Sequence, residues 1–411
     1  ASQVDLAALF AERATQITRP GGVIGLLLPA KLWTSLSAGG IRSVLLDTCR
    51  ISSLEDWSEA PAAFDAVVYP SMLVATRVTD MTNTGRNPAS LRGVVHRKSG
   101  SLDWAGEPDR LSLDKSPGAP WLVIPPLVRD AFDLLTARGI RLAQTQIGRP
   151  TLGVKTGCND AFLVTPRPGW RADAKPDDHS CPPANRTWPV RSGDREDDVE
   201  TSFLRPVLRG ENVRPWSTNP IDAAIIWTHD SIGRPVDQLP RGTAGWLAPW
   251  RRQLEARTDA TRARRYWTLF RTEAADMRRP RVVWSDIGRV PRATVLARGD
   301  PTVPLNSCYV LFAPSIDEAC AVAALLNSAP VAAWLCALAE PARGGYHRFL
   351  GWTLARLPIP VDWGRAVSIL APIGRAALDG AEPDPHSLAI AVARAYRVRL
   401  SRLEPLLTWC L

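Results

Sequence analysis

The sequence predicts an α/β protein whose first residues belong to a doubly wound sheet. Residues 23–28 form a continuous apolar run, as expected of a strand that is buried on both faces. Residues 4–75 alternate helix, strand, helix, strand, strand, which is the order of the second half of a doubly wound (Rossmann-like) sheet. After residue 119 short strands and helices are mixed, which predicts an α+β domain, and the chain ends in a helical segment.

The first helix is predicted over residues 4–18, and the turn Arg19-Pro20-Gly21-Gly22 ends it. Its apolar residues recur at helical spacing: Leu6, Leu9, Phe10, Ala14 and Ile17. A second helix is predicted over 35–48, and strands over 51–57 and 64–75. No strand precedes the first helix, so the sequence lacks the first half of the sheet. We therefore expect that residue 1 is not the biological start of the fold.

The rest of the chain is predicted in three parts, after a first part of residues 1–78. Residues 79–118 form a connector with a small hairpin at 91–103, residues 119–362 form the α+β domain, and residues 363–411 form two or three helices broken at 380–385. Within 119–362 the predicted elements are a helix at 126–138, a hairpin at 153–164, a surface insertion at 166–200, strands at 203–216, 221–228, 281–285, 292–298 and 308–312, a strongly basic helix at 245–272, and helices over 316–340.

Composition describes a globular protein with a polyanionic partner. Of 411 residues, 45% are hydrophobic and 22% charged, the net charge is +9 and the pI is near 9.5. Five of the 50 basic residues are lysine, so arginine supplies the other 45. A GC-rich genome also favours arginine. The net positive charge nevertheless favours a polyanionic binding partner over an acidic one.

Cysteine and histidine spacing predicts free thiols in a reducing cytoplasm. Seven cysteines and five histidines are scattered, no two cysteines have C-x-x-C spacing, and no metal site is predicted. No signal peptide is recognised at the start. The uncharged segment 319–339 is interrupted by Asn327, Ser328 and Pro330, so two buried helices explain it better than a membrane span.

The segment 153–164 is the most informative stretch. Its order of β-forming residues, turn residues and β-forming residues predicts a hairpin whose tip presents Lys155, Thr156 and Asn159. Such donors on a rigid turn suit phosphates and base edges, and the alternative is an ordinary solvated hairpin tip. The overlapping stretch 148–156 nearly matches a nucleotide-binding P-loop, but Val154 separates the second glycine from Lys155, so we reject that reading.

Six motifs in a fixed order resemble the C-terminal part of gamma-class adenine-N6 DNA methyltransferases. The motifs are Pro20-Gly21-Gly22 before an apolar strand ending in Pro29, Phe64 before a second apolar strand, Lys155-Thr156-Gly157-Cys158-Asn159-Asp160-Ala161-Phe162, Leu204-Arg205-Pro206-Val207-Leu208-Arg209-Gly210-Glu211-Asn212-Val213, Leu325-Leu326-Asn327-Ser328 with Arg343-Gly344-Gly345-Tyr346-His347-Arg348-Phe349, and Leu357-Pro358-Ile359-Pro360. The chain is most similar in kind to fused type II G restriction–modification enzymes with a TaqI-like target-recognition domain. The resemblance extends to about residue 362.

The resemblance implies a division of labour. The whole enzyme would transfer a methyl group from S-adenosylmethionine to N6 of an adenine flipped out of double-stranded DNA. Residues 1–78 would be the end of the methyltransferase domain and residues 119–362 the target-recognition domain. Phe64 would stack on the flipped adenine, and its alternative role is a core phenylalanine. The DNA-contacting residues implied are Lys155, Thr156, Asn159, Arg209, Asn212, Arg214, Arg343, Tyr346 and Arg348.

The sequence departs from the family at its two catalytic motifs. No glycine-rich cofactor loop follows a first strand, and both Pro-Pro pairs follow Ile124 or Cys181, never the asparagine of an Asn-Pro-Pro-aromatic motif. No catalytic residue is therefore assigned, and we expect the isolated chain to be inactive. We expect double-stranded DNA as a partner, together with an upstream methyltransferase half or a separate catalytic chain, and no membrane. The alternatives are a non-catalytic DNA-specificity subunit and a basic scaffold of a phage-defence complex.

Overall fold

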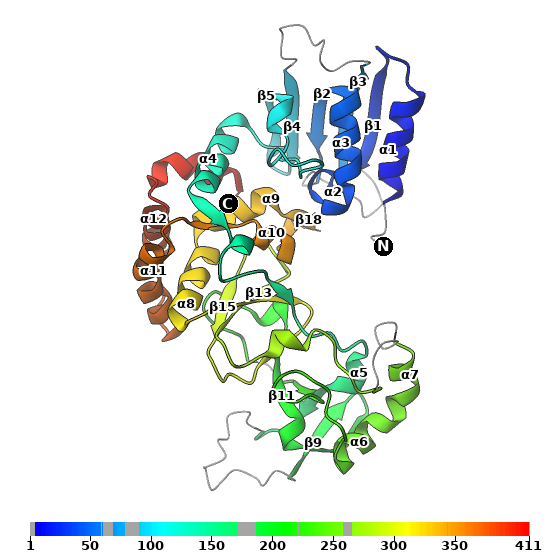
Figure 1. The fold of residues 1–411 in the computed structure, drawn as a ribbon, viewed down its shortest axis with the longest axis vertical. Helices are drawn as coiled ribbons and strands as arrows, with labels where there is room; N and C mark the ends of the chain where they lie inside the picture. Colours follow the sequence, from blue (N-terminus) through cyan, green and yellow to red (C-terminus); the bar gives the residue numbers. More distant parts are fainter. Residues whose placement is uncertain are drawn as a thin grey trace.

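The computed structural model describes residues 5–58, 60, 69–78, 90–170, 186–220, 222–257, 265–342 and 344–410. These residues form three hydrophobic cores, which define an N-terminal lobe, a helical middle body and a lower lobe (Figure 1). The core of the N-terminal lobe extends to Trp121, and the lower lobe is built from residues between 154 and 310. The middle body joins residues near 122–147 to residues 282–406, so segments distant in sequence share one core.

The N-terminal lobe contains a mixed five-stranded sheet. Its strands are β1 (Val23–Pro29), β2 (Cys49–Asp56), β3 (Pro70–Arg77), β4 (Leu91–Arg97) and β5 (Gly100–Gly106), in the order β1-β3-β2-β4-β5. Strand β3 lies antiparallel between β1 and β2, so β1 and β2 run the same way, and β4 is parallel to β2. The carboxyl ends of β1, β2 and β4 therefore meet at one edge of the sheet.

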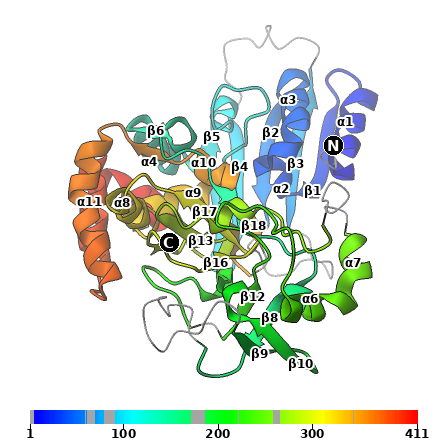
Figure 2. The same ribbon diagram turned by 60° about the horizontal axis from the view of Figure 1, so that its bottom comes forward.

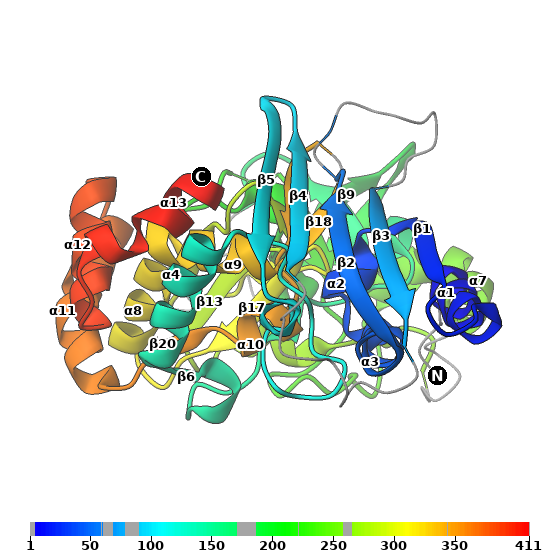
Figure 3. The ribbon, with the colours of Figure 1, turned by 90° about the horizontal axis from the view of Figure 1, so that it is seen from above.

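Helices cover one face of this sheet. In Figure 3, α1 (Leu6–Ile17) and α3 (Gly39–Thr48) lie on the same side of the strands, with the short α2 (Lys31–Thr34) after β1. Ile24 and Leu28 of β1 point into this core and are 4% and 3% exposed. Val23 and Leu27 alternate with them and are 70% and 59% exposed. The expectation that residues 23–28 are buried on both faces is therefore wrong for this structure.

The predicted hairpin at 91–103 is confirmed as β4 and β5, but its place in the fold differs from a connector. Strand β4 pairs with β2, so the hairpin extends the first sheet. Gly93 is required here, because a Cβ at this position would lie 2.4 Å from the Trp104 ring. The N-terminal lobe consequently includes most of the segment 79–118.

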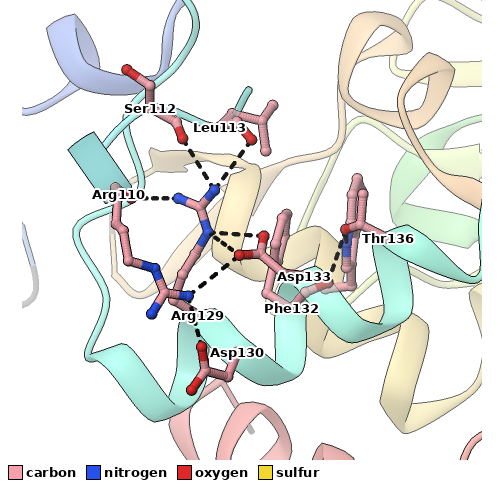
Figure 4. A network of polar contacts seen from close by, with 9 residues as sticks. Arg110, Ser112, Leu113, Arg129, Asp130, Phe132, Asp133 and Thr136 are labelled. Atoms are coloured by element: carbon pink, nitrogen blue, oxygen red, sulfur yellow. Dashed lines mark hydrogen bonds and ion pairs between the residues drawn. The ribbon is translucent and has the colours of Figure 1, made fainter. Parts of the chain in front are cut away.

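A buried arginine ties the end of the N-terminal lobe to the middle body (Figure 4). Arg129 of α4 (Pro126–Ala137) donates through Nε to both oxygens of Asp133 at 2.9 Å. Its other nitrogens donate to the main-chain carbonyls of Arg110, Ser112 and Leu113. Arg110 in turn pairs with Asp130 at 2.7 Å. Five donors in a fixed fork allow one guanidinium to hold a loop and a helix together.

The middle body is helical, and the C-terminal segment is part of it. Its helices are α4, α8 (Ile316–Leu326), α9 (Ala329–Leu338), α10 (Gly351–Ala355), α11 (Trp363–Leu378), α12 (Pro385–Ala395) and α13 (Glu404–Cys410). The predicted helices over 316–340 and 364–411 are confirmed, with breaks at 327–328 and 379–384. Ser315 caps α8 by accepting a hydrogen bond from the Glu318 amide, as N-cap serines do. Residues 363–411 share the core of Phe132 and Trp334, so they are not a separate unit.

Across the described part of the chain, none of the helices alone has the length and apolar character needed to cross a membrane. The apolar pair α8 and α9 is bent by 67° at its break. Most of its side chains are buried in the middle body.

One sheet is shared between the middle body and the lower lobe. Its strands are β15 (Ala293–Leu296), β13 (Arg281–Ser285), β17 (Cys308–Phe312) and β7 (Thr151–Leu152), in that order. Val282 and Trp284 of β13 point into the middle core, whereas Val283 between them points into the lower core. Strand alternation thus lets one apolar strand serve two cores.

The lower lobe has a six-stranded sheet with two short helices beside it. Its strands are β8 (Leu163–Pro166), β9 (Thr187–Ser192), β10 (Arg195–Glu200), β11 (Leu204–Leu208), β12 (Ala224–Ile226) and β16 (Val303–Pro304), in the order β10-β9-β8-β12-β11-β16. Figure 2 brings the β9–β10 hairpin forward, with α6 (Arg241–Leu247) close by. The predicted insertion at 166–200 therefore contains an ordered hairpin in its described part.

Two local predictions for the lower lobe are wrong. Residues 153–164 do not form a hairpin: Val154 pairs with Leu305, Lys155 pairs with Phe270, and the helical turn α5 (Asn159–Phe162) precedes β8. The predicted helix at 245–272 is α6, a 3-10 turn and α7 (Arg251–Glu255), and its described remainder from 265 to 270 is not helical. In both cases partners distant in sequence override the local pattern.

Candidate nucleic-acid interface

A cavity of about 410 Å³ lies where the N-terminal lobe meets the middle body. Its upper wall comes from the carboxyl ends of the three parallel strands. The residues are Ala30, Trp33 and Thr34 after β1, Asp56 at the end of β2 with Ser58 after it, and Val95 and Arg97 on β4. Its lower wall comes from the end of α9, the strands β18 (Glu340–Ala342) and β19 (Tyr346–Arg348), and residues 408–410 of α13. The carboxyl edge of a parallel arrangement is where α/β proteins place ligands.

The segment that carries Phe64 begins and ends beside this cavity. Phe64 itself lies outside the described residues, so its predicted stacking role stays a prediction. Ser58, on one side of the segment, lines the cavity. On the other side, the Tyr69 carbonyl accepts a hydrogen bond from the Ala30 amide at 2.7 Å, and Ala30 also lines the cavity.

The cavity's side nearest the C-terminus is closed by an arginine and a tryptophan. The Arg97 guanidinium lies 4.3 Å from the Trp409 ring centre and donates through Nη2 to the Trp409 carbonyl at 2.7 Å. The Trp104 ring meets Trp409 edge-on at 5.8 Å. These contacts fix the last helix against the first sheet, and neither Arg97 nor Trp409 stands out in the sequence as a site residue.

The Gly-Gly-Tyr-His-Arg motif supplies one wall of the cavity. Gly344 and Gly345 have φ angles of +78° and +76°, a conformation that favours glycine, and they lead into β19. Tyr346 and His347 line the cavity, and Arg289 lies 5.3 Å from the Tyr346 ring. Arg343 lies outside the described residues, so its predicted DNA contact stays a prediction.

Arg348, the last residue of β19, belongs to an ion pair. It bonds Asp286 at 2.7 Å, and this carboxylate raises the pKa of Arg348 further. Burial raises the pKa of the nearby Glu340 carboxyl, which favours its neutral form. Arg348 thus remains cationic beside the Asp286 carboxylate, which is largely shielded from solvent. The Arg348 side chain itself is 44% exposed.

The structure brings the turn at 155–159 and the turn at 209–214 to the same edge of the lower lobe. Residues 303–305 lie between two segments that run parallel to them. Val207 and Leu208 of β11 pair with Val303 and Pro304 of β16, and Val154 pairs with Leu305. Neighbouring parallel segments deliver the residues that follow them to one side. The predicted contacts Lys155, Asn159, Arg209 and Arg214 therefore start from a common edge.

The first of these turns, residues 155–159, is called the recognition turn below. Lys155 and Asn159 are exposed, and the Lys155 main chain exchanges two hydrogen bonds with Phe270 at 2.9 and 3.0 Å. Thr156 is 4% exposed, and its hydroxyl donates to the Asn159 side-chain oxygen at 2.7 Å and accepts from the Cys158 amide. In this conformation Thr156 orders the turn, whereas Lys155 and Asn159 face solvent.

The second turn is held against the shared sheet. Gly210 donates its amide to the Ser307 hydroxyl at 3.0 Å, and a Cβ there would lie 2.5 Å from the Ser307 carbonyl. Arg209 is half-exposed beside Glu211 at 3.7 Å, and Asn212 is partly exposed in the 3-10 turn η6 (Gly210–Asn212). Arg214 donates to the carbonyls of Glu211 and Val213, so its side chain stabilises this turn. Its predicted DNA contact stays a prediction.

Asp286 connects the two parts of the candidate interface. It follows Ser285 at the end of β13, and the same Ser285 hydroxyl lies 2.7 Å from where a Cβ of Gly210 would be. Its carboxylate pairs with Arg348, the residue that follows the cavity-lining His347. No motif in the sequence singles out Asp286, because its partners Ser307 and Arg348 are distant from it along the chain. In the ranges that the structure describes, no group of three His, Cys, Asp or Glu side chains is placed to hold a metal ion.

Comparison with known proteins connects this architecture to restriction–modification enzymes. No family model matches the sequence. The chain is 23% identical over 385 residues to the type II methyltransferase M.PaeR7I of Pseudomonas aeruginosa, covering 87% of this chain and 59% of that protein. It is therefore a distant relative of a type II methyltransferase and spans about three fifths of its length.

Solved structures give the same connection at the level of the fold. The type IIL restriction–modification enzyme MmeI, solved in complex with DNA, matches with a TM-score of 0.54 and 11% identity, over 99% of this chain and 49% of that chain. The type IIG restriction endonuclease BpuSI matches over 100% of this chain and 50% of that chain, at 13% identity and a TM-score of 0.39. The MmeI match shows a common fold over nearly the whole chain.

Proposed function

We propose that this chain is the DNA-recognition part of an S-adenosylmethionine-dependent adenine-N6 DNA methyltransferase of a restriction–modification or phage-defence system. One observation carries the proposal: the chain combines a cavity at the carboxyl ends of β1, β2 and β4 with a lower lobe whose two polar turns, at 155–159 and 209–214, leave one common edge. The relationship to M.PaeR7I and the fold shared with MmeI support it.

The two parts of the interface suit the two tasks of such an enzyme. An extruded base needs a pocket with flat walls and polar groups, and the cavity offers Trp33, Tyr346 and His347 on opposite walls. Duplex recognition needs phosphate contacts and base contacts from exposed donors, and Lys155, Asn159 and Arg209 supply these types. We propose that the target adenine enters the cavity beside the segment of Phe64, and that the two turns read the flanking sequence.

The residues in the described chain do not fit an S-adenosylmethionine site. A dinucleotide-like cofactor needs a glycine-rich turn after a parallel strand, where main-chain amides can approach it. In the described residues, β1 is followed by Ala30-Lys31, β2 by Trp57-Ser58 and β4 by the hairpin turn Lys98-Ser99, and none of these turns contains glycine. We therefore propose that the cofactor is bound by another part of the full enzyme, in the cytoplasm.

An exposed apolar surface supports the presence of such a part. On α1, Leu6, Phe10 and Ile17 are 79%, 67% and 69% exposed, and on β1 Val23 and Leu27 are similarly exposed. Within the described sheet β1 is an edge strand. Groups of exposed large apolar residues beside an edge strand suit a surface that another protein element covers. We propose that the methyltransferase half packs on this α1–β1 surface.

A second candidate function follows from the same surface. If the covering half is a separate polypeptide, the chain is a non-catalytic DNA-specificity subunit that docks onto a methyltransferase chain. The coding sequence immediately upstream distinguishes the two: an Asn-Pro-Pro-aromatic motif in the same reading frame favours a single enzyme, and a start codon at residue 1 favours a subunit.

The proposal is tested by separating recognition from attraction. A preferred duplex is selected from a random pool by the chain, and Asn159→Ala is compared with Arg252→Gln, an exposed arginine of α7. If Asn159 reads a base edge, its loss costs about 1–3 kcal/mol on the preferred duplex and little on a scrambled one. Arg252→Gln should leave the ratio of the two affinities unchanged, because phosphate contacts carry no sequence information.

The unmodified chain should also lose affinity steeply as salt rises, by a factor of about 10³ or more from 50 to 200 mM if six or more phosphates are contacted. Equal affinity at low and high salt, or an Asn159→Ala variant that weakens both duplexes alike, would contradict DNA recognition by the recognition turn.

A further inference from the structure

Arg257 is buried beneath the recognition turn, although the sequence predicts it as one of many arginines in a strongly basic helix. It follows α7 and is 7% exposed. Its guanidinium donates to four main-chain carbonyls: Leu254 at 2.9 Å through Nε, Tyr266 at 2.6 Å and Thr268 at 3.0 Å through Nη2, and Thr156 through Nη1. One side chain therefore links the end of α7, the segment 266–268 and the recognition turn.

The Arg257 side chain also packs closely against the recognition turn and the residues beside it. Gly157 has a φ of +69°, and a Cβ at this position would lie 2.7 Å from Arg257 Cδ. The guanidinium also lies 5.6 Å from the Phe162 ring and 5.0 Å from the Phe270 ring. Phe270 is the residue that pairs with the main chain of Lys155. Arg257 thus contacts the turn itself, Phe162 after the turn, and Phe270, which pairs with Lys155.

We propose that Arg257 is a positioning residue for DNA recognition: it fixes the conformation in which Lys155 and Asn159 are presented, without contacting DNA itself. This inference rests on the proposed function of the recognition turn as the reader of DNA sequence. The guanidinium suits this role because its five donors form a rigid planar fork. A lysine ammonium at the end of a flexible stem cannot reach carbonyls of residues 156, 254, 266 and 268 in the same geometry.

The burial of Arg257 separates this role from ordinary charge attraction. Its positive charge is enclosed by carbonyls and rings, whereas Arg252, five residues earlier, is exposed. A phosphate-contacting arginine adds affinity for any sequence and steepens the salt dependence. A positioning arginine changes the preference among sequences and leaves the number of phosphate contacts as it was.

The inference is tested with Arg257→Lys, which keeps the charge, and with Gly157→Ala, which disturbs the same contact from the turn. Arg252→Lys is the matched control on α7. The first measurement is amide hydrogen exchange of the free chain, resolved to residues 155–162, at a temperature where thermal unfolding shows each variant to be folded. Arg257→Lys and Gly157→Ala should speed exchange in this segment by about tenfold or more, since fewer bonds hold it closed. The control should leave it unchanged.

The second measurement is competition binding of the selected and scrambled duplexes over a range of salt. Arg257→Lys should reduce the ratio of the two affinities by about tenfold, which is within the range for a lost base contact. Affinity for the scrambled duplex and the salt slope should stay as in the unmodified chain, because no phosphate contact is removed. A role in overall stability alone would not change this ratio in a folded variant.

Three outcomes separate a failure of the positioning role of Arg257 from a failure of DNA reading by the recognition turn. Unchanged exchange at 155–162 in both variants would overturn the positioning role. Faster exchange with an unchanged affinity ratio would also overturn it, if Asn159→Ala still lowers the ratio. If Asn159→Ala is neutral as well, the proposed reading of DNA by the turn fails instead, and the exchange data then show only how Arg257 holds the turn.

Discussion

Strands β1 and β13 have similar apolar sequences but very different surroundings. In β13 the alternating residues Val282 and Val283 enter two different cores, and both are fully buried. In β1 only one set of alternating residues is buried, while Val23 and Leu27 on the other set are exposed to solvent. An apolar run predicts burial on two faces, and β13 satisfies that prediction with elements of this chain alone. The difference indicates that β1 has one face prepared for a covering element.

Helix α1 repeats the contrast within a single element. Ala8 and Ala11 are buried against the sheet, whereas Leu6 and Phe10 on the opposite side are exposed. An amphipathic helix normally turns its large apolar residues inward and its small or polar residues outward. The reversed pattern on α1 and the exposed side of β1 are therefore two apolar surfaces of the N-terminal lobe, and both lie at its β1 edge.

The largest expected effect comes from placing a charge in each strand. Val283→Asp buries a carboxylate at a site with no exposure and should destabilise the chain by more than about 4 kcal/mol, or prevent folding. Val23→Asp should change the stability by no more than about 0.5 kcal/mol, because the site is 70% exposed. Thermal unfolding followed by circular dichroism compares the two. An equally severe Val23→Asp would show that the outer face of β1 is already covered.

The stability of the chain should depend on pH through one buried histidine of the lower lobe. Burial lowers the pKa of His229 from 6.5 to about 4, and its Nε2 accepts a hydrogen bond from the Leu269 amide. The folded state therefore holds this side chain neutral where the unfolded chain binds a proton. The stabilisation is fully present above about pH 6.5 and is lost as the pH falls toward 4, up to about 3 kcal/mol.

Unfolding of the chain measured between pH 7.5 and 4.5 checks this dependence. His229→Gln keeps an acceptor and removes the titration, so its stability should fall less over the same range. Identical pH profiles for the two proteins would contradict a buried neutral His229.

The smallest effect on stability is expected on the exposed side of α1. Leu6→Glu with Phe10→Glu should change the unfolding free energy by no more than about 0.5 kcal/mol per site, since both side chains are solvent-exposed. The same double variant should reduce self-association of the isolated chain, measured by sedimentation equilibrium, because it removes an exposed apolar patch. Ala11→Glu, on the buried side of the same helix, is the control and should prevent stable folding. Unchanged self-association in the double variant would show that the patch does not drive it.

Elements with strong local patterns could be predicted from the sequence. The apolar segments of α8 and α9, their break at 327–328, and the strands β13 and β17 follow from periodicity and turn residues alone. The turn at 155–159 was predicted as a hairpin tip because Val154 and residues 162–164 look like paired strands. Val154 instead pairs with Leu305, a choice that depends on residues about 150 positions away.

The candidate site was only partly predictable for the same reason. The Gly344-Gly345 turn could be singled out, since such a pair permits positive φ and close approach. The cavity itself is formed by residues from 30 to 410, and no local pattern indicates that Arg97 meets Trp409 or that Asp286 meets Arg348. Arg257 shows the limit most clearly, because an arginine among arginines gave no sign of burial.

Methyl transfer from labelled S-adenosylmethionine to plasmid DNA tests the central claim most directly. The pure chain should bind DNA but transfer no label, and addition of the cofactor-binding half, encoded upstream or by a neighbouring gene, should produce transfer to adenine N6. Leu6→Glu with Phe10→Glu should abolish that restored transfer while leaving the chain's own affinity for DNA unchanged. Transfer by the chain alone, or restored transfer that is insensitive to the double variant, would contradict the account.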